Sequence, residues 1–189
     1  KKKKSKIYYA CKANSNLSII KILGENGACI DAQSPGEAYI ALKAGIKPEN
    51  ILLTGDNCSS EDFNFCIEKG IPVNVGSLLQ LEKYSKLAPG TGVSVRINPD
   101  VGAGHHDHTI TGGPKTKFGI YYDKVDDIKK TAGNYKMTIT GIHCHIGSGI
   151  LEADKFLEAV KITLSCAANF ENLEFVDFGG GIGVPYRDT

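Results

Sequence analysis

Short apolar runs typical of buried strands alternate with helical segments along the whole chain, and this alternation limits the possible folds more than any other feature. Each run is short and apolar, as strands buried on both faces of a parallel sheet usually are. The first five recur at intervals of about 20 residues, close to the shortest length that a strand, a crossover helix and two loops can occupy. The predicted strands cover residues 7–11, 28–32, 51–54, 73–75, 93–97, 138–145 and 173–178.

This repeat predicts an α/β fold with parallel strands. An open doubly wound sheet and a (β/α)8 barrel both satisfy it, but the nearly constant spacing, without a long reversing crossover, favours the barrel. The 189 residues fall short of the roughly 200 to 250 that such barrels usually need, so we expect an incomplete (β/α)8 TIM-type barrel with about seven of its eight strands. In a barrel, functional residues lie where strands end and in the loops that follow.

Composition excludes several classes of function. The 22 Lys and Arg residues nearly balance 21 Asp and Glu residues, which argues against a nucleic-acid-binding protein, and the basic run of Lys1–4 and Lys6 is local and receives no function. No stretch approaches the roughly 18 to 20 continuous apolar residues of a membrane span. The six cysteines form no CxxC pair, so we expect buried thiols in a reducing compartment and a cytoplasmic location.

A lysine follows the first predicted strand and precedes a helix. In a barrel this position places Lys12 at the mouth, where its amine can form a Schiff base with a carbonyl compound. A structural lysine held in a salt bridge is the alternative interpretation of this residue.

Glycine dominates the segment after the last predicted strand, since it fills every position of residues 179–183 except Ile182. Glycines at such a point allow backbone N–H groups to turn towards an anion, as phosphate sites in barrels often do after the late strands. The spacing differs from the GxGxxG dinucleotide fingerprint because the first three glycines are contiguous. We therefore predict a phosphate site here.

Two histidines, His143 and His145, lie two residues apart on the sixth predicted strand and should point to the same face. They could bind a metal ion, one imidazole could lie flat on an aromatic cofactor, or both could be hydrogen-bonded core residues. The long segment 101–119 is predicted to be an active-site flap. The residues that could complete a metal site are Asp31, Asp177, His105, His106 and His108.

Six motifs, taken together and in this order, resemble the pyridoxal-phosphate-dependent decarboxylases with an alanine-racemase-like barrel, in particular the branch that acts on diaminopimelate. The resemblance spans nearly the whole chain. The motifs are YACKANSN (9–16), DAQSPGE (31–37), RINPDV (96–101), KFGI (117–120), GIHCHIGS (141–148) and DFGGG (177–181).

The resemblance implies roles for residues of this chain. Lys12 would hold pyridoxal 5'-phosphate through a Schiff base and act in catalysis, and His145 would stack on the pyridine ring. Asp31 and Arg96 would line the surroundings of the cofactor. The residues that would hold the phosphate are Ser148, Gly179, Gly180 and Gly181.

The resemblance also implies an activity, the decarboxylation of meso-diaminopimelate to L-lysine in lysine biosynthesis by a homodimer. A related decarboxylase of ornithine, arginine or another diamino acid is one alternative, and a metal-dependent barrel hydrolase using His143 and His145 is another. The expected partners are a small amino-acid substrate and a second copy of the protein, and neither nucleic acid nor a membrane.

The family pattern contains parts that residues 1–189 do not show. These are the eighth barrel strand, which carries the acidic partner of the pyridine nitrogen, and a second, β-rich domain. We therefore expect residues 1–189 to be a partial cofactor-binding barrel that by itself binds the cofactor weakly and turns over little.

Overall fold

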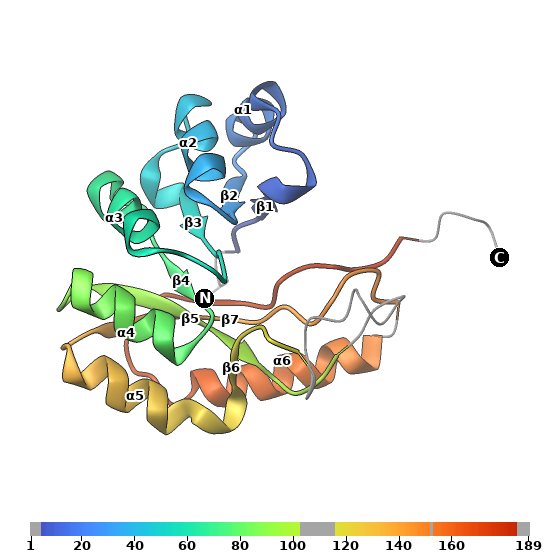
Figure 1. Cartoon of the computed structure of the whole chain (residues 1–189). Coiled ribbons are helices and arrows are strands. Elements are labelled where there is room, and N and C mark those ends of the chain that lie inside the picture. Colours follow the sequence, from blue (N-terminus) through green and yellow to red (C-terminus); the bar gives the residue numbers. More distant parts are fainter. Residues whose placement is uncertain (1–4, 103–115, 152, 185–189) are drawn as a thin grey trace. The chain divides into compact units, whose positions relative to one another are not determined.

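A computed structural model describes residues 5–102, 116–151 and 153–184 (Figure 1). The first four lysines, the three histidines of the 101–119 segment and most of the predicted flap lie outside these residues. The chain divides into two compact units, Lys1–Asn74 and Val75–Thr189. Each unit is described separately below.

The first unit contains a parallel sheet of order β1-β2-β3, with a helix in each connection between strands and a third helix after β3. This is the repeat of strand and crossover helix that the sequence predicts. A further parallel bridge joins Leu53 to Val73. The strands are β1 (Tyr8–Ala10), β2 (Cys29–Ala32) and β3 (Ile51–Leu53), and the helices are α1 (Leu17–Glu25), α2 (Pro35–Lys43) and α3 (Ser60–Lys69), with 3-10 turns at Cys11–Ala13 and Pro48–Asn50.

Helix α2 begins and ends through contacts encoded in the sequence. Ser34 is its N-cap, with Oγ accepting a hydrogen bond from the Glu37 N–H at 3.3 Å. The Glu37 carboxylate accepts from the N–H of Gln33 at 2.8 Å, one residue before the position that a regular capping box uses. Gly45, with φ +88°, ends the helix because this left-handed conformation suits glycine.

The second unit has the sheet order β4-β5-β7-β8, with β6 paired to the end of β5. Strand β4 contains the boundary between the units. Helices α4, α5 and α6 lie on the same side of strands β5 and β7 (Figure 1). The strands are β4 (Asn74–Val75), β5 (Gly92–Asn98), β6 (Ile120–Tyr121), β7 (Thr138–His143) and β8 (Phe175–Asp177), and the helices are α4 (Leu78–Leu87), α5 (Val125–Asn134) and α6 (Ala153–Ala167), with a 3-10 turn at Tyr122–Lys124.

Two rows of residues cross β5, β7 and β8 on opposite faces of the second sheet. The register aligns Val95, Ile142 and Val176 in one row. The next positions align Arg96, His143 and Asp177. Because successive side chains on a strand alternate between faces, the apolar row and the polar row point in opposite directions. A polar row on one face is typical of a sheet that carries a site there.

All seven predicted strands are confirmed, with ends that differ by up to two residues. The structure adds β6, a pair of residues after Gly119 that is too short to produce a period in the sequence. The described pairings of the named strands are parallel, which confirms the α/β fold. Among the described residues the strands form two sheets and no closed barrel, as expected for an incomplete (β/α)8 set.

The cysteines support the prediction of buried thiols. All six are free and buried. Burial raises the pKa of the Cys66 thiol to about 12, with further increases from Cys58 and Asp62. The Cys66 thiol is therefore protonated and poorly reactive at neutral pH. Within the described ranges, no helix is long and apolar enough to cross a membrane.

Helix α3 provides a test of these local contacts. Ser59 Oγ accepts from the Asp62 N–H at 3.1 Å, and the Asp62 carboxylate accepts from the Ser59 N–H at 2.8 Å. Replacing Ser59 by Ala should lower the free energy of unfolding by about 1 kcal/mol, because one helix N–H loses its acceptor. Urea unfolding followed by circular dichroism measures this change. The neighbouring Ser60→Ala is the matched control and should stay within about 0.5 kcal/mol. Equal effects at the two serines would contradict the capping role.

Candidate functional site

The residues that the sequence singles out fall into two groups, one in each unit. The first unit carries Lys12 and Asp31. The second unit carries the remaining six, which are Arg96, His145, Ser148, Gly179, Gly180 and Gly181. All of these follow a parallel strand or lie near its C-terminal end, the edge at which ligands bind in α/β folds.

In the first unit, Lys12 and Asp31 lie at the C-terminal ends of neighbouring strands. Lys12 is in the 3-10 turn that directly follows β1, and its side chain is exposed. Asp31 pairs in register with Ala10, the last residue of β1. The structure therefore places the lysine where the sequence predicts it, with an accessible amine and a carboxylate on the adjacent strand.

A hydrogen-bond network fixes Asp31. Thr54, directly after β3, donates its hydroxyl to Asp31 Oδ1. The Gln33 amide Nε2 lies 2.5 Å from Thr54 Oγ1 and 3.5 Å from Asp31 Oδ1. No role was predicted for Thr54 or for Gln33, which the sequence marked only as part of the DAQSPGE motif. The signal that could have found them is a polar residue directly after each of two neighbouring parallel strands.

Burial and two carboxylates near the end of β1 raise the pKa of the Cys11 thiol. Burial raises the pKa of the Cys11 thiol to about 11, and Glu37 and then Asp31 add to this increase through their negative charge. Both carboxylates are thus near enough to act on the residue next to Lys12. The thiol remains protonated at neutral pH, so Lys12 is the nucleophilic candidate at this strand end.

In the second unit, the histidine pair differs from its prediction. Strand β7 ends at His143, so His145 lies beyond the strand and the alternation argument does not apply to it. His143 is buried at 8% exposure, whereas His145 is partly exposed. Residues 5–102, 116–151 and 153–184 contain no group of three His, Cys, Asp or Glu side chains placed to bind one metal ion. The structure thus gives no support to a metal site on this pair, and His105, His106 and His108 lie outside the described residues.

The loops after β7 and β8 run side by side through backbone hydrogen bonds. The Cys144 N–H donates to the Asp177 carbonyl at 2.9 Å. Further along, the Ile150 N–H donates to the Gly181 carbonyl and the Gly183 N–H donates to the Ile150 carbonyl, each at 2.8 Å. This pairing brings the loop that carries His145 and Ser148 against the glycine-rich segment.

Two of the three contiguous glycines cannot be replaced without displacing this pairing. Gly179 and Gly181 have φ values of +71° and +84°, which residues other than glycine rarely adopt. A Cβ at Gly179 would lie 2.6 Å from the Cys144 carbonyl oxygen, and one at Gly181 would collide with the Gly147 carbonyl. Gly180 has open space around it. The turn is therefore a backbone cradle: Gly179 and Gly181 pack against the loop after β7, and Gly180 is unobstructed.

The Arg96 side chain contacts the backbone of the loop that carries His145. The guanidinium Nη2 lies 3.4 Å from the His145 carbonyl oxygen. Its Cζ lies 5.0 Å from the centroid of the Phe118 ring, within the range of a cation–π contact. Arg96 itself is buried. It therefore contributes by positioning His145 as well as by its charge.

Asp177 joins the polar row to the glycine turn. Its Oδ1 accepts a hydrogen bond from the Gly179 N–H at 2.7 Å. Burial raises the pKa of the Asp177 carboxyl, and this hydrogen bond and the nearby His145 act in the opposite direction. The sequence marked Asp177 only as a possible metal ligand and as part of the DFGGG motif.

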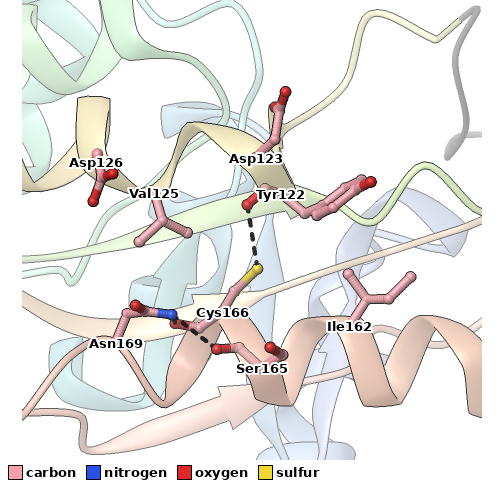
Figure 2. Close-up of a pocket in the computed structure, with 8 residues that line it drawn as sticks. All are labelled: Tyr122, Asp123, Val125, Asp126, Ile162, Ser165, Cys166 and Asn169. Carbon is pink, nitrogen blue, oxygen red and sulfur yellow. Dashed lines mark hydrogen bonds between the residues drawn. The ribbon is translucent and has the colours of Figure 1, made fainter.

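A separate pocket of about 310 Å³ lies between the start of α5 and the end of α6 (Figure 2). Two of its polar side chains have partners: Cys166 Sγ lies 3.7 Å from the Tyr122 carbonyl, and the Asn169 amide donates to the Ser165 carbonyl at 2.9 Å. The pocket contains none of the predicted site residues. It is lined by Tyr122, Asp123, Val125, Asp126, Ile162, Ser165, Cys166 and Asn169.

Comparisons with known proteins agree with the resemblance seen in the sequence. The profile of the pyridoxal-binding domain of pyridoxal-dependent decarboxylases matches residues 1–189. A diaminopimelate decarboxylase of Methanothermobacter thermautotrophicus is 45% identical over 186 residues, which cover 95% of this chain and 44% of that protein. The crystal structure of diaminopimelate decarboxylase from Helicobacter pylori complexed with L-lysine has 36% identity and a TM-score of 0.91, covering 100% of this chain and 50% of that chain.

A more distant structure supports the fold alone. The lysine/ornithine decarboxylase of Vibrio vulnificus, complexed with putrescine, is 22% identical with a TM-score of 0.79 and covers 96% of this chain and 47% of that chain. The chain thus spans about half the length of the proteins that it matches.

The glycine turn makes a direct prediction. Gly181→Ala should lower the free energy of unfolding by about 1–3 kcal/mol, because Ala at positive φ is strained and its Cβ collides with the neighbouring loop. Gly180→Ala, at the open position, should change it by no more than about 0.5 kcal/mol. Urea unfolding of both variants measures the difference. If Gly180→Ala proves as damaging as Gly181→Ala, the described cradle is wrong.

Proposed function

This chain belongs to the family of pyridoxal-dependent decarboxylases, whose pyridoxal-binding domain it matches over residues 1–189, and we propose that the protein decarboxylates meso-diaminopimelate to L-lysine. The proposal concerns the whole protein, because the chain spans about half the length of its curated relatives. The cofactor of the family is pyridoxal 5'-phosphate.

The observation that carries the proposal is the glycine turn of the second unit, packed against the loop of His145 and Ser148. The turn fits a phosphate group, since Gly180 is exposed and unobstructed. Asp177 already accepts the Gly179 N–H, so the N–H groups of Gly180 and Gly181 are the ones that the turn offers to an anion. The exposed Ser148 can add a hydroxyl donor, and the partly exposed His145 offers an imidazole face. In the proposed site, the glycine turn and Ser148 hold the phosphate and His145 stacks on the pyridine ring.

Lys12 is the proposed attachment point of the cofactor and the main catalytic residue. Its exposed amine follows β1, beside the carboxylate of Asp31 on β2. The bound cofactor supplies an electron sink that weakens the bond between the substrate Cα and its carboxylate. Lys12 would hold the cofactor, and its Nζ could carry the proton that replaces the carboxylate on the substrate Cα. The Thr54–Gln33 network keeps the Asp31 carboxylate at the same edge of the sheet.

The choice of substrate rests on the relatives and on one segment of the chain. The relative at 45% identity and the lysine complex at 36% identity are both diaminopimelate decarboxylases, whereas the lysine/ornithine decarboxylase is only 22% identical. The sequence around residues 98–100 and 117–119 also favours the diaminopimelate branch. Decarboxylation of ornithine, arginine or another diamino acid is thus the less supported alternative.

We also propose a cytoplasmic location and a homodimer. The free, buried cysteines suit a reducing compartment. The homodimer follows from the resemblance to the family, and sedimentation velocity of the full-length protein tests it. A monomer at micromolar concentration would contradict it.

Substitution of Lys12 tests the proposed chemistry. Lys12→Ala in the full-length protein should lower carbon dioxide release from meso-diaminopimelate by at least about 100-fold, because the amine that holds the cofactor and moves the proton is lost. The matched control is Lys21→Ala, an exposed lysine on α1 in the same unit, which should retain activity within about twofold. Undiminished turnover by Lys12→Ala would contradict the assignment.

A substrate panel tests the specificity. With pyridoxal phosphate present, the full-length protein should release carbon dioxide from meso-diaminopimelate at least about 100-fold faster than from L-ornithine or L-arginine, by differential transition-state binding. Faster turnover of ornithine or arginine would show that the protein is instead a decarboxylase of that amino acid. Hydrolase activity that depends on zinc, without decarboxylation, would contradict both.

A further inference from the structure

Asp177 occupies a position that connects the polar row of the sheet to both loops of the candidate site. Its backbone carbonyl accepts from the Cys144 N–H at 2.9 Å, which fixes the start of the loop that carries His145. Its carboxylate Oδ1 accepts from the Gly179 N–H at 2.7 Å, which fixes the start of the glycine turn. One residue thus holds a backbone N–H at or near the start of each loop.

The contact between the two loops shows why this placement has consequences. A Cβ at Gly179 would lie 2.9 Å from Nδ1 of His145, so the Gly179 backbone packs directly against the imidazole. A shift of the Gly179 amide of even a few tenths of an ångström would therefore displace the ring or open a gap beside it. The Asp177 carboxylate sets the position of this amide.

Arg96 acts on the same histidine from the other end of the polar row. The register places Arg96, His143 and Asp177 side by side on β5, β7 and β8. Arg96 holds the His145 carbonyl at 3.4 Å, while Asp177 holds the glycine against which the His145 ring packs. The two charged residues at the ends of the row thus hold the backbone and the ring of His145 from different strands.

We propose that Asp177 is a positioning residue for the cofactor, which places the glycine turn and the His145 ring through its hydrogen bond to the Gly179 N–H. This inference rests on the proposed function, since it assumes that the turn and His145 bind pyridoxal phosphate. Asp177 itself does not touch the cofactor in this account. What matters is an acceptor at the position of Oδ1, and the negative charge of the side chain is secondary.

The alternative is a local turn with no effect on the site. A carboxylate that accepts from the N–H two residues ahead is a common device that stabilises loops. In that case the loss of Asp177 would lower stability and leave the affinity and the environment of the cofactor unchanged. The two accounts therefore differ in measurements made on the bound cofactor.

Three substitutions in the full-length protein separate the acceptor from the charge. Asp177→Asn keeps an oxygen at the Oδ1 position and loses the charge, Asp177→Glu keeps the charge and moves the oxygens, and Asp177→Ala loses both. The control is Glu174→Ala, an exposed acid just before β8. Each variant is titrated with pyridoxal phosphate, and the visible circular dichroism of the bound cofactor reports the asymmetry of its surroundings. Thermal unfolding records stability separately.

Asp177→Asn and Glu174→Ala should bind pyridoxal phosphate within about threefold of the parent and keep its visible dichroism. Asp177→Glu and Asp177→Ala should bind about 10-fold or more weakly and lose much of the dichroic band, as expected when the acceptor for the Gly179 N–H is lost from its position. If Asp177→Ala does not fold, the comparison of Asp177→Asn with Asp177→Glu still distinguishes the positioning role from a local turn. Parent-like binding by Asp177→Glu, or weak binding by Asp177→Asn, overturns the inference. Failure of the parent protein to bind pyridoxal phosphate would instead contradict the proposed function.

Discussion

The backbone hydrogen bonds between the loops after β7 and β8 are the constraint on which the candidate site of the second unit depends. Three of them, from Cys144 to Asp177 and in both directions between Ile150 and the glycine segment, keep the loops in contact beyond the ends of the strands. This close approach excludes side chains at Gly179 and Gly181. These two glycines permit the pairing, and the turn that they form leaves Gly180 between them exposed and unobstructed, where its backbone can approach a phosphate.

Much of this arrangement could be predicted from the sequence, because it follows from local patterns. Buried parallel strands produce apolar runs that a reader can count, and parallel strands bring their C-terminal ends to one edge. The positions of Lys12, Asp31 and the glycines after strands were therefore predicted correctly, whereas their roles towards the cofactor remain predictions. The capping of α2 by Ser34 follows from a local pattern too, since serine, proline and glutamate at fixed offsets mark a helix start.

The sequence failed where geometry depends on contacts between distant residues. His145 lies past the end of β7, because the strand ends at His143 and the following loop is held against the glycine segment by backbone hydrogen bonds. The roles of Gln33, Thr54 and Asp177 come from hydrogen bonds to Asp31 and Gly179 that no single-segment pattern reveals. Strand β6 escaped prediction because two residues carry no periodicity. Polar residues at strand ends therefore mark where a site lies, but their partners must be read from the structure.

The central claim is that the protein binds pyridoxal phosphate with Lys12 as its attachment point. The most direct test is borohydride reduction of the full-length protein with bound pyridoxal phosphate, followed by mass spectrometry of its peptides. Reduction makes the link between the cofactor aldehyde and a lysine amine permanent. The account predicts a visible absorption band that disappears on reduction, and the cofactor attached to the peptide that contains Lys12. Attachment at a different lysine, or a colourless protein that carries no modified peptide, would contradict it.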